Sequence, residues 1–264
     1  MDLARTRAVS PRLSVLAEAG STNDVLAELV RAGGEPAMSM VVTLNQTSGR
    51  GRLGRVWTAP PNRTVAASVL VRPGVSSGSV FPFGWIPLLA GAAMSVSIDA
   101  LVGDGRTGLK WPNDVQVDGR KICGVLAELV PSGDAVIVGT GVNLTLTEDE
   151  LPVPTATSLA LAGVDERGDE LVDLVLSRYL LTLRELVDRL VAFGGDATAS
   201  GAHRLVSEWC RTLGREVRVS LPGGDDLFGT ATGIDETGRL LVREQGVDRI
   251  TAVAAGDVTH LRYE

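Results

Sequence analysis

Cysteine and histidine are scarce in this chain of 264 residues, which contains two of each. Cys123 and Cys210 lie far apart in the sequence and form no CxxC motif, the spacing typical of redox and zinc sites. With only His203 and His260 beside them, a zinc ion has almost no candidate ligands. We expect both cysteines to be small buried residues of a protein that works in a reducing cytoplasm.

An excess of positive charge is also absent. The formal net charge is −7, and no basic run is longer than a few residues. The phosphates of nucleic acids attract proteins largely through clustered lysine and arginine. This charge balance therefore argues against nucleic-acid binding by the chain as a whole and predicts no specific DNA binding.

Long uncharged apolar runs are missing as well. Residues 1–12 carry charges and contain no apolar core of a signal peptide. Residues 88–102 are the most apolar stretch, but they include Gly91, two serines and Asp99. A membrane-spanning helix needs about 20 predominantly apolar residues. These absences predict a cytoplasmic protein that does not enter a membrane.

The composition is that of a globular protein, with 44% hydrophobic and 22% charged residues. The length suits one large domain followed by a small one. We predict a loose lead-in over residues 1–12, a main domain over 13–213 and a C-terminal domain over 214–264. The boundary is placed near Gly214, where the pattern of the chain changes.

Apolar spacing and turn residues predict the order of helices and strands. Helices are expected from about 21 to 32, 87 to 102, 169 to 193 and 202 to 213. Strands are expected over 13–17, 40–44, 65–71, 114–117, 123–130 and 135–139. The tail contains five short predicted strands, 216–221, 227–234, 240–243, 248–254 and 258–261, which is the pattern of a small β-barrel.

The segment QTSGRGRLGRVW over residues 46–57 contains GxGxxG directly after a predicted strand. A dinucleotide-binding fingerprint would need a following helix and an acidic residue roughly 20 positions further on. No helix follows, because two prolines break the chain at 60–61, and no acidic residue lies at that distance. Glycines let backbone amides approach an anion closely, and guanidinium groups pair with phosphate or carboxylate. This segment therefore predicts an anion-binding loop, and a mobile, solvated basic loop is the alternative.

The segment KWPND over residues 110–114 and the strand that follows it suggest a second part of the same site. Asn113 and Asp114 offer oxygen atoms to Mg²⁺, which binds few protein ligands besides phosphate oxygens. Lys121 would place a cation at the edge of a strand, beside the bare backbone of Gly124. The alternatives are an ordinary Asn-Asp turn and a surface lysine.

Two further segments offer places for a ligand. Gly139 and Gly141 alternate in a strand pattern and would leave one face of the sheet bare, although a strand bulge is an equal alternative. Ser21, Thr22 and Asn23 open a predicted helix, where hydroxyls and free N–H groups can meet a polar ligand.

Five segments in order resemble biotin–protein ligases. They are GSTND at 20–24, NQTSGRGRLGRVW at 45–57, GLKWPNDV at 108–115, GRKICGVLAEL at 119–129 and GTGVNL at 139–144. The resemblance implies an α+β fold. Its catalytic domain is similar to class II aminoacyl-tRNA synthetases, with a mixed sheet flanked by helices, and a small C-terminal SH3-like β-barrel follows.

The resemblance also implies the roles of the site residues, with ATP and biotin as substrates and Mg²⁺ as cofactor. The catalytic residues would be Lys121, Arg50, Arg52 and Asp114. Biotin would be bound by Ser21, Thr22, Asn23, Gln46, Gly49, Arg50, Gly51, Arg52, Lys121, Gly124, Gly139 and Gly141. ATP would be bound by Arg52, Trp57, Asn113 and Asn143, and Mg²⁺ by Asp114 and Asn113. The partner would be the biotin carboxyl carrier domain of an acyl-CoA or pyruvate carboxylase.

The sequence departs from the family's pattern at Cys123, where alanine is common, and at Leu53, where histidine or a basic residue is common. Only about twenty residues precede Ser21, so we expect no helix-turn-helix domain and no repressor activity. A lipoate or octanoate ligase or transferase of the same fold, and a non-enzymatic biotin sensor, are the competing functions. The sequence does not give the oligomeric state.

Overall fold

The computed structural model describes residues 1–264 with the exception of 75–80, 222–223, 255 and 261–264. Its helices are α1 (Ala4–Val9), α2 (Thr22–Ala32), α3 (Trp85–Val102), α4 (Gly168–Ala192) and α5 (Ala202–Trp209). The strands of the main domain are β1 (Leu13–Leu16), β2 (Met40–Thr43), β3 (Gly49–Arg50), β4 (Val56–Trp57), β5 (Thr64–Val71), β6 (Thr107–Lys110), β7 (Asp114–Val117), β8 (Arg120–Leu129) and β9 (Val136–Asn143).

Seven of these strands form one sheet in the order β1-β2-β5-β9-β8-β7-β6. β1 and β2 run parallel, and the remaining neighbours are antiparallel, so the predicted mixed sheet flanked by helices is confirmed. β9 was predicted to stop at Gly139, but it continues to Asn143 because this glycine-containing end still pairs with β5 and β8. β6 was not predicted; it is a four-residue strand that depends on antiparallel pairing with β7.

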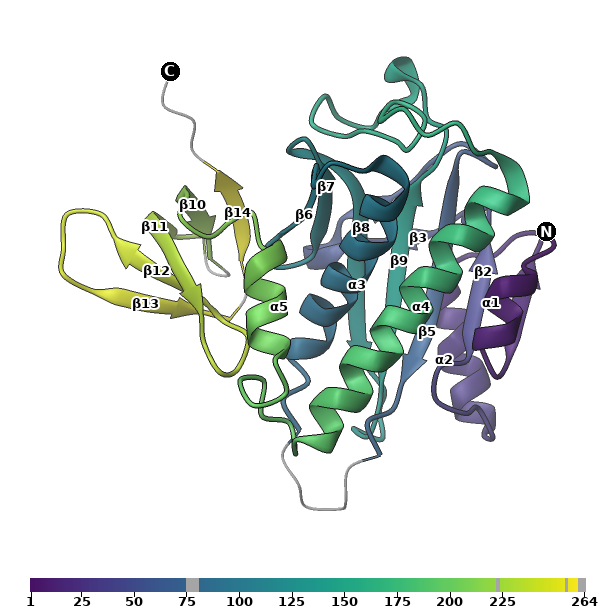
Figure 1. The fold of residues 1–264 in the computed structure, drawn as a ribbon, viewed down its shortest axis with the longest axis horizontal. Coiled ribbons are helices and arrows are strands. Elements are labelled where there is room, and N and C mark those ends of the chain that lie inside the picture. The colour runs from purple at the N-terminus through teal and green to yellow at the C-terminus, as the bar shows by residue number, and fades with distance from the viewer. Residues whose placement is uncertain (75–80, 222–223, 255, 261–264) are drawn as a thin grey trace.

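The two faces of this sheet have different partners. On one face, α3 and α4 pack side by side in front of the strands (Figure 1). On the other face, α2 covers Val41, Leu70 and Ile137, which alternate with residues of the main core along their strands. The part of this second face that α2 leaves uncovered contains the candidate site.

Helix α3 is the one helix of the described residues that is long and apolar enough to cross a membrane. It packs against the sheet, α4 and α5, and 67% of its residues are buried inside the fold. Trp85 and Met94 are both 0% exposed. Its all-round apolar surface is therefore accounted for by burial in the protein core.

The predicted loose lead-in is wrong, because residues 4–9 form helix α1 and pack against α4. Leu3 is fully buried. The carboxylate of Asp173 accepts hydrogen bonds from the backbone N–H of Thr6 at 2.8 Å and of Arg5 at 2.9 Å. The Thr6 hydroxyl donates to the same carboxylate at 2.7 Å. The tertiary hydrogen bonds to α4 hold this short helix, which local sequence patterns could not show.

We expect Asp173→Ala to lower the free energy of unfolding by about 3 kcal/mol, because three hydrogen bonds to a buried carboxylate are lost. Burial by itself would raise the pKa of Asp173, but the hydrogen bonds from Thr6 and Arg5 outweigh it and lower that pKa. The contribution of Asp173 to the free energy of unfolding is therefore complete above the ordinary aspartate pKa of about 4. It is lost as the pH falls through the lowered pKa of Asp173 in the folded protein. Urea denaturation at several pH values measures both effects, with the more exposed Asp169→Ala as the control.

The C-terminal part is a second, separate sheet. It contains β10 (Glu216–Ser220), β11 (Asp226–Ile234), β12 (Leu240–Glu244), β13 (Ile250–Val253) and β14 (Asp257–His260), in the antiparallel order β13-β12-β11-β10-β14. α5 was predicted to reach residue 213 but ends at Trp209, because Cys210 forms a bridge with Leu109 of β6. The five predicted strands are confirmed, with ends that shift by one or two residues; the SH3-like class and the boundary at Gly214 remain predictions.

Candidate active site

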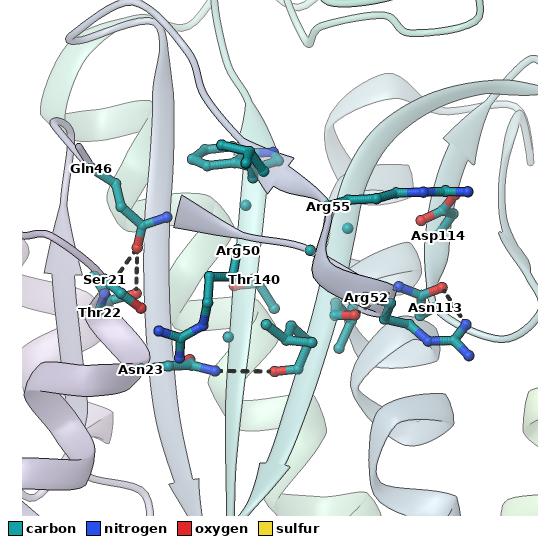
Figure 2. A pocket seen from close by; sticks show the side chains of 18 of the residues that line it. Ser21, Thr22, Asn23, Gln46, Arg50, Arg52, Arg55, Asn113, Asp114 and Thr140 are labelled. Carbon is teal, nitrogen blue, oxygen red and sulfur yellow. Dashed lines mark hydrogen bonds between the residues drawn. The ribbon is translucent and has the colours of Figure 1, made fainter. Parts of the chain in front are cut away.

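A cavity of about 170 Å³ opens on the uncovered face of the sheet, under the β3–β4 hairpin (Figure 2). Its walls come from the start of α2, the hairpin, the turn between β6 and β7, and strands β8 and β9. The predicted site residues that line it are Ser21, Thr22, Asn23, Gln46, Arg50, Gly51, Arg52, Trp57, Asn113, Asp114, Lys121, Gly124, Gly139 and Gly141. Four separate sequence segments thus meet in one place.

Uncharged polar side chains gather at one end of the cavity, where the charge of the neighbouring Arg50 is compensated by its carboxylate partners Asp24 and Glu128. Ser21 occupies the N-cap position of α2, as predicted, although its side chain makes no capping hydrogen bond. The backbone N–H of Thr22 donates to Gln46 Oε1 at 2.9 Å, so the side-chain amide of Gln46 is held with its oxygen toward the helix. The hydroxyls of Ser21 and Thr22 and the amides of Asn23 and Gln46 lie together at this end (Figure 2).

The opposite end carries charge. Lys121 Nζ lies 2.6 Å from Asp114 Oδ1. Arg52 donates to Asn113 Oδ1 at 3.2 Å, and burial lowers its pKa without removing its charge. Arg55 lines the same end of the cavity (Figure 2). Three cations and one carboxylate therefore face the end away from Gln46.

Arg50 was also predicted to meet an anionic ligand, together with Lys121 and Arg52. In the structure its guanidinium already has two carboxylate partners. Its guanidinium makes a bidentate pair with Asp24 at 2.5 and 2.7 Å and also donates to Glu128 at 3.2 Å. Hydrogen bonding to Asp24 raises the pKa of Arg50, and the same contact lowers the pKa of Asp24. These contacts tie the hairpin to α2 and β8, so Arg50 holds the roof of the cavity in place.

The floor is bare because glycines occupy its central positions. Gly124 of β8 is the register partner of Gly141 of β9. A Cβ at Gly141 would lie 2.7 Å from the Trp57 ring, and one at Gly139 would lie 2.4 Å from Asn23 Oδ1. Both distances are too short for any side chain, so the predicted bare sheet face is present. Trp57 rests directly on it.

The GxGxxG segment forms a hairpin rather than a phosphate-binding turn before a helix. β3 pairs with β4, and a short 3-10 helix (Arg52–Gly54) joins them. Gly49 needs to be small because a Cβ there would lie 2.4 Å from the backbone oxygen of Trp57. The local fold thus confirms that this segment is no Rossmann fingerprint.

Comparisons with known proteins agree with this site. Residues 16–144 match the biotin/lipoate A/B protein ligase family, and residues 212–261 match the biotin protein ligase C-terminal domain. The chain is 38% identical to a biotin–[acetyl-CoA-carboxylase] ligase of Mycobacterium tuberculosis, over 95% of this chain and 90% of that protein. The chain belongs to the biotin protein ligase family. The resemblance seen in the five motifs is thereby confirmed.

Two further relatives support the membership of this ligase family. The chain is 30% identical to the bifunctional ligase/repressor BirA of Escherichia coli, over 89% of this chain and 70% of that protein. The structure of a biotin protein ligase from Aquifex aeolicus in complex with biotin and ATP superposes with a TM-score of 0.73 and 27% identity. That match covers 96% of this chain and 100% of the other.

Two of the residues expected in a ligase site lie outside the cavity lining. Gly49 is buried in β3 of the hairpin, and Asn143 is buried with its amide donating to the Thr157 carbonyl at 2.8 Å. Their roles remain predictions. The lining also includes residues that were not selected from the sequence, Arg55, Val56, Val125, Leu126 and Thr140. Arg55 and Val56 belong to the Arg/Gly motif itself, and the other three are strand neighbours of the floor glycines.

Both cysteines are buried and unpaired, as expected from the sequence. Burial raises the pKa of the Cys123 thiol to about 12. A thiol with such a pKa stays protonated at neutral pH and is a poor nucleophile. Cys123 is therefore part of the core beneath the site and not of its chemistry.

Proposed function

We propose that this protein activates biotin with ATP and transfers it to a lysine of a carrier protein. The observation that carries the proposal is that uncharged polar side chains gather at one end of the cavity and cations at the other, with glycines of the sheet between them. Biotin has the same division: a neutral ureido ring at one end, an aliphatic chain, and a carboxylate at the other. The relatives named as biotin ligases support the same reaction.

In this proposal the ureido ring lies between α2 and Gln46, where Ser21, Thr22 and Asn23 offer hydroxyl and amide groups. The aliphatic chain is proposed to cross the sheet near Gly139 and Gly141, whose lack of side chains makes room for Asn23 and Trp57 beside it. The carboxylate then reaches Lys121 and Arg52. Trp57 and Asn143 are proposed to contact adenine, and Gly49, Gly51 and Gly124 to let the backbone approach the ligand.

The first step joins two anions. An oxygen of the biotin carboxylate attacks the α-phosphorus of ATP, the bond to the β-phosphate breaks, and pyrophosphate leaves with its electron pair. Lys121 and Arg52 lower the barrier by stabilising charge on the phosphorus oxygens. Arg50, whose charge is compensated by Asp24 and Glu128, contributes mainly by keeping the hairpin over the reacting groups.

Asn113 and Asp114 fit a Mg²⁺ ion that arrives with ATP. No cluster of three or more His, Cys, Asp or Glu side chains that could hold a metal occurs in the described part of the chain. Mg²⁺ bound to nucleotide needs only one or two protein oxygens besides phosphate and water. Asp114 and the side-chain oxygen of Asn113 would supply these, and the ion would neutralise phosphate charge.

In the second step the neutral amine of the carrier lysine attacks the acyl carbon of biotinyl-AMP. The bond to the phosphate oxygen breaks, AMP leaves, and the amine loses one proton. Asp114 lies at this end of the cavity and is proposed to orient the amine or accept that proton. The β3–β4 hairpin is proposed to act as a lid that keeps water from the anhydride.

The fold class of the two domains, the carrier protein and the location of the reaction are part of the same proposal. Acyl-adenylate formation fits a catalytic domain similar to class II aminoacyl-tRNA synthetases, followed by an SH3-like domain that starts near residue 214. The carrier is proposed to be the biotin carboxyl carrier domain of an acyl-CoA or pyruvate carboxylase, and the reaction to take place in the cytoplasm.

The deciding experiment is incubation of the protein with ATP, Mg²⁺, biotin and a carrier domain, followed by mass spectrometry of the carrier. We expect the carrier to gain one biotinyl group, and to gain none when its target lysine is replaced by arginine. Lipoate has no ureido ring for the uncharged end of the cavity. Modification with lipoate and not with biotin would therefore contradict the proposal and favour the lipoate ligases of the same family.

A further inference from the structure

Ser68 of β5 lies beneath the uncharged end of the cavity, and no sequence motif marks it. Its side chain is 0% exposed. Its hydroxyl oxygen lies 2.6 Å from Asn23 Oδ1 and 2.7 Å from Thr22 Oγ1. Both of these neighbours line the cavity, whereas Ser68 does not. A fully buried residue thus contacts two candidate ligand-binding groups from behind.

The orientation of the Asn23 amide is fixed from its other side. Asn23 Nδ2 donates to Glu128 Oε2 at 2.6 Å and also faces the Leu126 carbonyl at 3.5 Å. An ionised carboxylate only accepts hydrogen bonds, so a reversed amide would bring two acceptors together. Asn23 Oδ1 must therefore face Ser68. The missing side chain of Gly139 leaves the room in which this amide lies.

The number of protons available decides which hydroxyl donates and which accepts in each of these hydrogen bonds. A hydroxyl has a single proton to donate. Asn23 Oδ1 has none, so the 2.6 Å contact requires the proton of Ser68. The 2.7 Å contact between Ser68 and Thr22 then requires the proton of Thr22. The longer contact between Thr22 Oγ1 and Gln46 Oε1, at 3.2 Å, is the one that remains without a proton.

We propose that Ser68 is a positioning residue that makes the Thr22 hydroxyl a hydrogen-bond acceptor toward the cavity. Glu128 accepts from Asn23, Asn23 therefore accepts from Ser68, and Ser68 therefore accepts from Thr22. A substrate that fits must then present an N–H donor to Thr22, which the ureido ring of biotin does. This inference rests on the proposed function and adds a specificity residue to it.

The first test is Ser68→Ala, studied by biotin-dependent exchange of pyrophosphate into ATP. We expect the KM for biotin to rise about tenfold, because Thr22 loses its fixed acceptor role and one ordinary hydrogen bond is weakened. The kcat and the KM for ATP should stay unchanged, since Ser68 contacts neither charged residue. Ser68→Cys should have a KM for biotin between those of the unmodified protein and Ser68→Ala, because a thiol is a weak donor and acceptor.

Ser97→Ala is the matched control. Ser97 is also 0% exposed and also loses one buried hydrogen bond, to the Val175 carbonyl at 2.7 Å, but it lies in α3 on the other face of the sheet. We expect a loss of stability without a change in the KM for biotin. In a Thr22→Val background, Ser68→Ala should have no further effect on that KM, because the group through which it acts is absent.

Three results would overturn the inference: an unchanged biotin KM in Ser68→Ala, equal KM changes in Ser68→Ala and Ser97→Ala, or additive effects in the double variant. Failure of the proposed function would be seen differently. In that case the unmodified protein itself would show no biotin-dependent exchange, whereas an active protein with an unaffected Ser68→Ala variant would refute only the role of Ser68.

Discussion

Replacement of Lys121 by alanine is expected to lower kcat/KM for biotin-dependent pyrophosphate exchange by about 10²–10³-fold, the usual cost of losing one donor to a developing charge. Lys121 Nζ lies at the cationic end of the cavity, 2.6 Å from Asp114 Oδ1. The change removes a cation from the place where the biotin carboxylate meets the α-phosphate. It also leaves the carboxylate of Asp114 without its partner, which adds repulsion toward both substrates.

The protein should stay folded in this variant, because the side chain of Lys121 is 40% exposed. Arg120→Ala is the matched control: this neighbouring cation of β8 pairs with Glu148 and does not line the cavity. Exchange kinetics and thermal denaturation of both variants separate catalysis from stability. Lys121→Ala with the kinetics of the unmodified protein would refute the assignment of this residue.

Apolar spacing and turn residues predict most of the helices and strands, because these signals depend only on residues close together in the sequence. The glycine pair at 33–34 ends α2, and short apolar runs rich in β-branched residues give β2 and β5. The motif residues also identified most of the cavity, since each motif turned out to lie at one wall of it. Helix α1 was missed because its stability depends on Asp173, more than 160 positions further along the chain.

Sequence patterns could not show how the side chains of the site are paired. Arg50 looks like a free cation in a Gly/Arg segment, and only the fold brings Asp24 and Glu128 to it. Ser68 looks like any small residue of a buried strand, and its role depends on register: it is the partner of Gly139, over which Asn23 lies. Such contacts join residues that are distant in sequence, so composition and spacing contain no record of them.

Arg52→Gly is expected to let biotinyl-AMP escape from the cavity before transfer. Arg52 belongs to the short helix at the tip of the hairpin, and it joins that tip to Asn113 and to the Gly256 carbonyl of the C-terminal part. Its loss removes a cation that would face the phosphate and also the contacts that hold the hairpin down. Hydrogen bonds to charged groups contribute about 1.5–3 kcal/mol, so the rate of release should rise by roughly ten- to a hundredfold.

The escaped anhydride would react with any accessible amine, so the measurable result is biotin on lysines of a bystander protein such as serum albumin. Adenylate formation should continue at a reduced rate, since Lys121 is still present, and this separates the variant from a simply inactive one. Arg63→Gly is the control, because Arg63 pairs with Glu150 and does not line the cavity. If Arg52→Gly retains biotinyl-AMP as well as the unmodified protein does, the hairpin is not the lid, and protection of the anhydride must come from the carrier or from the C-terminal sheet.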